Sequence, residues 1–244
     1  MQDRYAGDIG DFGKLGLLRA LRKEGLSVGV NWYLVPDEKH NGDGRHIHYL
    51  SKAAYRLCDE ELWRSLNLIV ASGQRSVAAL EKEKILQASF FSKPLAFQGR
   101  PRPERERMRE SWHREALASL AGVDIVFVDP DNGLMVSSAV GTTKENKYVT
   151  VRELADYYAQ GSSVIYYQHK ARVGDEFYID QHRRLLEYNA IKGASGLGLK
   201  FMPTSQRYFF FMVQQKHRSI VLNGVQEMLT TDWKNCFRLL PDTI

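Results

Sequence analysis

The sequence predicts an α/β fold, in which strands and helices alternate along the chain. Two apolar runs, at residues 124–128 and 163–167, have the β-branched and aromatic composition of buried strands. Between them, residues 151–160 repeat apolar side chains at helical spacing. Strands joined by helices pair in parallel and form a sheet that is covered on both faces. We therefore expect a Rossmann-like three-layer sandwich with a mostly parallel central sheet.

The first predicted elements are a helix and a strand. Residues 11–23 place Phe12 and three leucines at helical spacing, with Asp11 as the expected cap and Gly25 as the stop. Residues 27–35 (SVGVNWYLV) have strand composition and run into a polar, turn-rich loop. The chain thus enters the sheet from an N-terminal helix.

The middle of the chain is predicted to be mainly helical. Residues 51–90 are expected to form helices, with Asp59 as a cap and a break at Gly73. Residues 99–115 alternate basic and acidic side chains, which is typical of a solvated loop and helix face; the alternative is an arm whose arginines contact phosphates. We treat residues 51–118, approximately, as an insertion.

The C-terminal half repeats the alternation of helices and strands. Thr150 and Gly161 bound the helix at 151–160 as cap and stop. The aromatic pairs and the FFF run of this half fall inside expected elements, so we assign them to the core. The remaining expected elements are strands at 163–167, 199–202 and 207–214, and helices at 179–189 and 221–229.

Composition fits one large domain spanning 1–244, because a chain of 244 residues with 43% hydrophobic residues can bury a sizeable core. No apolar run approaches the roughly 18 residues needed to span a bilayer, and the N-terminus lacks a secretory h-region. Cys58 and Cys236 lack metal-site or disulfide spacing. We expect a cytoplasmic protein with no membrane partner. The net charge of +5 is compatible with a nucleic-acid partner, RNA or DNA.

Polar residues follow the predicted strands, and this places a site at one edge of the sheet. In parallel sheets, ligands bind outside the carboxyl ends of the strands, near a switch in strand order. The sharpest motif is Asp129-Pro130-Asp131-Asn132-Gly133, because proline ends strand pairing and leaves the carboxylates and amide beyond the sheet. These groups suit hydrogen bonds to a base amine or binding of a divalent cation. The alternative is a turn that only closes the strand.

The segment YAGDIGDFGK opens the first helix and is a second candidate. Its glycines allow a ligand close to the backbone, and amides at a helix start favour anions. The alternative is a cap followed by an exposed loop. The residues of interest are Tyr5, Gly7, Asp8, Asp11 and Lys14.

The loop after the first strand lies where a nucleotide-binding loop would lie. It offers Asp37, Gly42, Gly44 and Arg45, although Asn-Gly is also a common turn. Its polar side chains could be assembled into a metal site, but their spacing matches no structural zinc pattern, and polar loop surface is the other interpretation. The side chains concerned are Asp37, His40, Asp43, His46 and His48.

Taken in order, these motifs resemble the bacterial large-subunit ribosomal RNA adenine-N6 methyltransferases. That family has an aromatic, Gly-Asn-x-Ala-Asp-x-x-Lys segment at its first helix, then a loop ending Gly-x-Gly-Arg, and later Asp-Pro-Pro-Tyr. The counterparts here are residues 7–14, the strand 31–35 with the loop ending at 42–45, and residues 129–132.

The resemblance implies that S-adenosylmethionine is bound by residues 7–14 and the loop 37–45. Asp129 and the carbonyl of Pro130 would hold the target amine, with Asp131 and Asn132 beside them. Such a base must be single-stranded or flipped out of a duplex. His169 and Lys170, at the end of the strand 163–167, are expected to contact the nucleic-acid substrate.

Two other functions remain open at this point. Asp129, Asp131, Gln168 and Lys170 have the outline of a metal-dependent nuclease or phosphohydrolase that would use magnesium. A nucleic-acid-binding relative without catalytic activity is the third possibility, because a fold does not fix a function.

Overall fold

The computed structural model describes residues 1–38, 42 and 44–241 of the chain. Its centre is a seven-stranded sheet with the order β2-β1-β3-β6-β8-β7-β9. The strands are β1 (Val28–Asn31), β2 (Ser89–Phe91), β3 (Ile125–Val128), β6 (Ser163–His169), β7 (Ser195–Phe201), β8 (Arg207–Val213) and β9 (Phe237–Leu239). A small second sheet pairs β4 (Gly133–Leu134) with β5 (Tyr148–Val149).

The expected mostly parallel sheet is confirmed for five of its strands. The strands β2, β1, β3 and β6 pair in parallel. Strand β8 is antiparallel to both β6 and β7, so β7 runs in the same direction as the first four strands. Strand β9 is antiparallel to β7, which makes the sheet mixed at this end.

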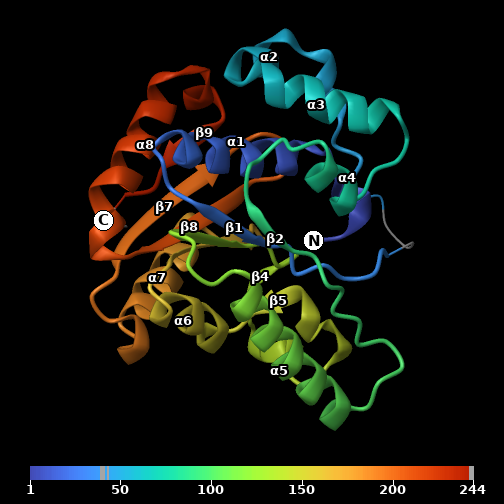
Figure 1. Cartoon of the computed structure of the whole chain (residues 1–244), viewed down its shortest axis with the longest axis vertical. Helices are drawn as coiled ribbons and strands as arrows, with labels where there is room; N and C mark the ends of the chain where they lie inside the picture. Colours follow the sequence, from blue (N-terminus) through green and yellow to red (C-terminus); the bar gives the residue numbers. More distant parts are fainter. Residues whose placement is uncertain (39–41, 43, 242–244) are drawn as a thin grey trace.

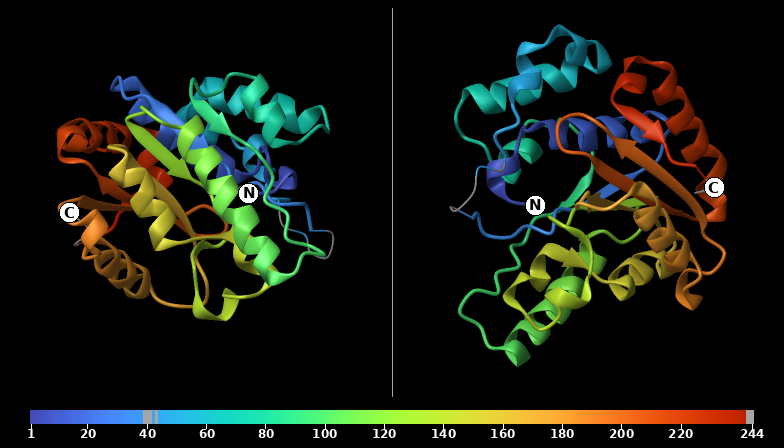
Figure 2. Two further views of the ribbon diagram at one scale, coloured as in Figure 1. Left: turned by 60° about the horizontal axis from the view of Figure 1, so that its bottom comes forward. Right: turned by 180° about the vertical axis from the view of Figure 1, so that it is seen from behind.

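Helices cover both faces of the sheet, as Figure 1 and the rear view in Figure 2 show. One layer holds α1, α3, α4 and α8, and the other holds α5, α6 and α7. The helices are α1 (Ile9–Lys23), α2 (Ala53–Cys58), α3 (Glu60–Ala71), α4 (Val77–Lys82), α5 (Arg102–Ser119), α6 (Val151–Ala159), α7 (Asp175–Leu186) and α8 (Arg218–Thr230). No helix among the described residues combines the length and apolar character that crossing a membrane requires.

The order of the strands reverses between β1 and β3. From β1 the chain passes through α2, α3 and α4 to β2, and it returns through α5, in the other layer, to β3 on the opposite side of β1. A crevice forms at the carboxyl ends of two strands whose connections leave in opposite directions. The fold therefore places its natural ligand-binding position beyond Asn31 and Val128.

The FFF run and most of the paired tyrosines of the C-terminal half lie in the core, as expected from their position inside elements, while Tyr158 is only partly buried. Phe209 and Phe211 pack in one helical layer, while Phe210 packs in the other, because successive side chains of a strand point to opposite faces. Tyr157 and Tyr166 are also fully buried. This apolar filling holds the strand ends in fixed positions.

Several predicted boundaries are wrong. The cap of α1 is Asp8, whose Oδ1 accepts the amides of Gly10 at 2.7 Å and Asp11 at 3.1 Å, so the predicted cap Asp11 lies inside the helix. The end of the region predicted as helical is strand β2, which is only three residues long and therefore has little periodicity of its own. Strand β9 was not expected from the sequence.

Helix α5 accounts for most of the charged region 99–115. Its outer face carries exposed ion pairs such as Arg102 with Glu106, as a solvated helix face predicts. Arg109, in contrast, is partly buried and donates to both carboxylate oxygens of Glu153 at 2.7 Å. Burial alone would lower the pKa of Arg109, but Glu153 raises it above its usual value. The nitrogens of this guanidinium already donate hydrogen bonds within the protein, so Arg109 does not act as an arm residue that contacts phosphates.

A buried histidine of the core, His182, makes stability depend on pH. His182 is fully buried, stacks on Phe210 and pairs with the hydroxyl of Tyr166 at 3.1 Å. Burial lowers the pKa of His182 to about 3 from 6.5. Below pH 6.5 the unfolded chain therefore binds a proton at His182, whereas the folded chain binds this proton only below about pH 3. As the pH decreases through this window, we expect the free energy of unfolding to decrease by up to about 1.4 kcal/mol per pH unit.

Urea unfolding of the wild type and His182→Gln at pH 7 and pH 5 checks this expectation. The variant lacks the titrating group, so the difference in stability between the two proteins should be smaller at pH 5. Asp11 also titrates in this range, but it does so in both proteins. Equal differences at the two pH values would contradict the account.

Candidate functional site

The motifs that lie far apart in the sequence meet at the carboxyl ends of β1 and β3. The ammonium of Lys14 in α1 lies 2.7 Å from Oδ2 of Asp129, which directly follows β3. It also donates to Oδ1 of Asp11, one turn earlier in α1, at 3.1 Å. All three side chains are buried. The YAGDIGDFGK segment is thus joined to the Asp-Pro motif by a buried ion-pair network.

Electrostatics in this network are set by burial and by the single ammonium. Burial raises the pKa of Asp11 to about 6, although Lys14 opposes the shift. Burial would lower the pKa of Lys14, but the carboxylates of Asp129 and Asp11 raise it above its usual value. Lys14 is therefore charged at neutral pH, and its ammonium forms a buried ion pair with Asp129.

Asp131 projects toward the first residues of the chain. Its carboxylate lies 2.6 Å from the amino group of Met1 and 2.6 Å from Nε2 of Gln2. Burial would raise the pKa of Asp131, but the amino group, the Gln2 amide and Lys147 together lower it. The same amino group donates to the backbone oxygen of Asp129 at 3.0 Å. The backbone oxygen of Asp129 and the carboxylate of Asp131 thus both accept from the amino group of Met1.

The loop after β1 reaches the same place. A Cβ on Gly44 would lie 2.4 Å from the carbonyl of Arg4, and the residue has φ +82°, so only glycine fits this approach. The amide of Ile9, at the start of α1, donates to the carbonyl of His46 at 3.0 Å. The three predicted segments, the helix start, the loop and the Asp-Pro motif, are therefore neighbours.

The Asn132-Gly133 turn is fixed by Gln168 from β6. The Gln168 side chain accepts from the amide of Leu134 and donates to the carbonyl of Asn132, both at 2.9 Å. Gly133 has φ +106°, and a Cβ there would lie 2.1 Å from Gln168 Oε1. The turn is thus also a structural device, as the alternative interpretation of this motif proposed, while Asp131 lines the cavity at this edge and Asp129 lies behind it, in contact with Lys14.

A cavity of about 140 Å³ lies between these segments. Sites for cofactor-sized ligands usually have roughly 300–1,000 Å³. Met1 and Gln2 fill the crevice beside it and are almost fully buried. A ligand larger than the cavity must displace the segment Met1–Tyr5. The residues lining the cavity are Tyr5, Asp8, Gly10, Lys14, Gly44, His46, Asp131, Tyr167, His169, Ser205 and Arg207.

Other predicted residues lie outside this cavity. Gly7 packs against Val70 of α3, and its amide donates to Asp11. Asp37 accepts the amide of Arg4, at the outer side of the loop. Gly42 and Arg45 are exposed. His40, Asn41 and Asp43 lie outside the described residues.

The sequence interpretation missed Arg207, Ser205 and Tyr167 as site residues. Tyr167 was assigned to the core, and it is buried, but its ring also borders the cavity, with Lys14 Nζ 5.3 Å from the ring centroid. Arg207 begins β8 and pairs in register with His169 at the end of β6. Its position depends on the direction of β8, which the sequence pattern does not reveal.

The contacts of Asp129, Gln168 and Lys170 give little support to a metal-dependent nuclease. Lys170 donates to the carbonyl of Val173 and lies 3.7 Å from Asp175, while Gln168 is engaged with the turn. Asp129 is paired with Lys14 instead. Within the described residues, no three His, Cys, Asp or Glu side chains are grouped as a metal site.

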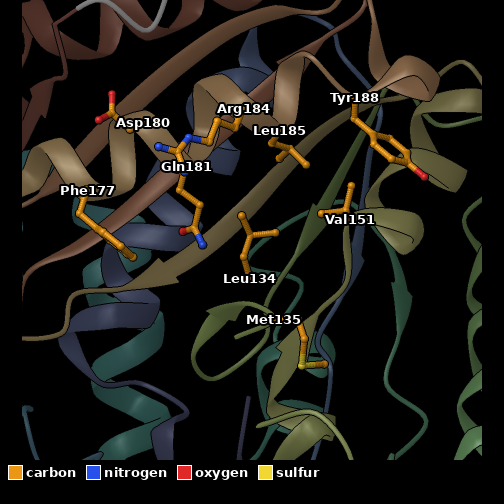
Figure 3. Close-up of a pocket in the computed structure, with 9 residues that line it drawn as sticks. All are labelled: Leu134, Met135, Val151, Phe177, Asp180, Gln181, Arg184, Leu185 and Tyr188. Atoms are coloured by element: carbon orange, nitrogen blue, oxygen red, sulfur yellow. The ribbon is translucent and has the colours of Figure 1, made fainter. Parts of the chain in front are cut away.

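A larger cavity, of about 420 Å³, lies elsewhere, between α7 and the strand β4 (Figure 3). Its walls are mainly apolar, with Leu134, Phe177 and Tyr188 around it. Asp180 and Arg184 are its only charged residues. It lacks the convergent polar groups of the crevice at β1 and β3, so we place the candidate site in the smaller cavity.

No model of a known protein family matches this chain, and no curated protein matches it either. The fold and the site define an α/β protein with a buried acidic and basic network at the switch point of its sheet.

Proposed function

We propose that the chain is an S-adenosylmethionine-dependent methyltransferase that acts on an amine of a nucleic-acid base. The observation that carries the proposal is the convergence of the helix start, the loop at Gly44 and Asp129 at the switch point. These are the three segments that resemble the rRNA adenine-N6 methyltransferases. The strand-order reversal supports the Rossmann-like assignment, since such sheets bind nucleotide-type ligands at this point.

The residues present fit the chemistry of the donor and acceptor. The backbone oxygens of Asp129 and Tyr33 and the carboxylate of Asp131 already surround one amino group, that of Met1. S-Adenosylmethionine carries an ammonium and a base carries an exocyclic amine, and both need such acceptors. We assign donor binding to Tyr5, Asp8 and the loop at Gly44.

In this proposal, Asp129 and the carbonyl of Pro130 accept hydrogen bonds from the target amine and orient its lone pair. When bound, S-adenosylmethionine supplies a methyl group whose bond to sulfur breaks, with the electron pair leaving on sulfur, as the amine lone pair forms the new N–C bond. The proton shed by the methylated amine passes to water. The carboxylate of Asp129, held by its ion pair with Lys14, stabilises the positive charge that develops on nitrogen.

The aromatic surface next to the base comes from another strand in this proposal. Asp131-Asn132 stand where the resembling family has Pro-Tyr. Tyr167 of β6 borders the same cavity and offers a ring face instead. The base reaches it only as a single-stranded or flipped nucleotide, because Asp129 is buried.

Calorimetric titration with S-adenosylmethionine, followed by transfer of a labelled methyl group to RNA and DNA, tests the proposal. We expect saturable binding with a micromolar Kd and label in one of the two nucleic acids. Magnesium-dependent cleavage of the same nucleic acids would favour the nuclease. Nucleic-acid binding with neither cofactor binding nor cleavage would favour a relative without catalytic activity.

A further inference from the structure

Arg207 carries a buried guanidinium for which no ion pair is found among the described residues. It is 4% exposed, and its one hydrogen bond runs from Nη2 to the hydroxyl of Ser205 at 2.6 Å. Within the described part of the chain, Nε and Nη1 have no acceptor, and no carboxylate forms an ion pair with them. The guanidinium lies over the ring of Phe201, 5.7 Å from the centroid, but a ring face does not replace the missing hydrogen-bond acceptors of Nε and Nη1.

The guanidinium lies against the first turn of α1, in the wall of the candidate cavity. A Cβ on Gly10 would lie 2.9 Å from Nη1 of Arg207 and 2.9 Å from Oδ1 of Asp8, the oxygen that accepts the amides of Gly10 and Asp11. Helix α1 has 15 residues, so its N-terminal dipole adds positive potential at this point. The amides of that turn are already taken by Asp8 and His46, so Arg207 is the group that still needs an acceptor.

We propose that Arg207 binds an oxyanion of the ligand, a carboxylate or a phosphate. A guanidinium presents parallel donors that match two oxygens of either group. Both Arg207 and Ser205 line the cavity, so an entering oxyanion can replace the Ser205 hydroxyl as the acceptor of Nη2. A cavity of about 140 Å³ suits a group of this size.

The anion has two possible sources, which rest on the proposed function. One is the amino-acid carboxylate of S-adenosylmethionine, and the other is a phosphate of the nucleic-acid substrate. The oxyanion site itself rests only on Arg207 and its surroundings. The two sources can be distinguished by comparing ligands that carry either the carboxylate or the phosphate with ligands that lack it.

The experiment compares Arg207→Met with the matched control Arg238→Met, which alters an exposed arginine of β9 in the same sheet. Calorimetry measures binding of S-adenosylhomocysteine against 5′-methylthioadenosine, which lacks the carboxylate, and of AMP against adenosine, which lacks the phosphate. For the charged member of one pair, we expect Arg207→Met to weaken binding by about 10- to 100-fold. The uncharged members and the control should be unaffected.

Thermal melting without ligand gives an independent readout. Removing an unpaired buried charge should leave Tm unchanged or raise it, whereas a guanidinium used for folding would lower Tm when removed. A lower Tm for Arg207→Met than for Arg238→Met, or equal binding of charged and uncharged ligands by the wild type, overturns the proposal. Dependence on Arg207 for AMP, without any binding of S-adenosylhomocysteine, sustains the oxyanion site and counts against the methyltransferase.

Discussion

Replacing Lys14 by Met should lower the free energy of unfolding by about 3–5 kcal/mol, because it leaves buried carboxylates without their counter-charge. Asp11 is fully buried and Asp129 is 1% exposed, and both contact the Lys14 ammonium. Met conserves most of the side-chain volume, so the loss reports charge more than packing. Urea unfolding followed by circular dichroism at pH 7 measures it.

The free energy of unfolding of Lys14→Met should also depend on pH, in a direction that follows from the carboxyls left without the ammonium. Without the ammonium, which lowers the pKa of Asp11, burial should raise the pKa of the Asp11 carboxyl further above its usual value in the folded protein. A raised pKa means that the folded state binds more protons than the unfolded state, so stability recovers as pH falls from 7 toward 5. The matched control is Lys93→Met, which breaks an exposed ion pair with Glu115 and should cost less than about 1 kcal/mol. Equal losses for the two variants would refute the network.

Replacing Asp129 by Asn should reduce methyl transfer by about 100- to 1,000-fold, the usual effect of removing one preorganised group that stabilises charge in a transition state. The amide keeps the shape of the carboxylate but not its charge. Because Asp129 is assigned to the target amine and not to the methyl donor, binding of S-adenosylmethionine should stay within a few-fold of the wild type. Label transfer and calorimetry on the same preparation separate the two effects.

Asp180→Asn is the control for Asp129→Asn, since Asp180 is an exposed aspartate paired with Arg183 on α7. Circular dichroism should show that both variants are folded at the assay temperature. A folded Asp129→Asn protein with wild-type turnover would remove Asp129 from the reaction. A loss shared by Asp180→Asn would show that the assay does not report on the site.

The convergence of the site could be predicted because it follows from a general property of parallel sheets. Asp129 ends a short apolar run, and such runs read as buried strands whose carboxyl ends share one edge. The position of Gly44 follows from the same reasoning, because its loop continues from β1. The sequence also located Lys14 at the start of the first helix, close to that edge.

The contribution of Arg207 could not be predicted for a topological reason. The run 207–214 has strand composition, but composition does not set strand direction. Because β8 is antiparallel to β6, its first residue lies beside the last residue of β6, His169, at the edge where ligands bind. In a parallel strand, Arg207 would have been at the opposite edge of the sheet.

Two smaller errors have local causes. Asp8 and Asp11 both precede or begin an apolar helical pattern, and either can serve as a cap by sequence. Asp11 lies three residues before Lys14, so within a helix its side chain faces that ammonium and is drawn inward. Strands β2 and β9 have three residues each, too few for a period of two to be visible.

A crystal structure of the chain with S-adenosylhomocysteine tests the central claim most directly. We predict that the ligand lies between the first turn of α1, Gly44 and Asp129, and that the segment Met1–Tyr5 has moved to admit it. A ligand bound instead in the apolar cavity beside Phe177, with Met1 still against Asp129, would contradict the account.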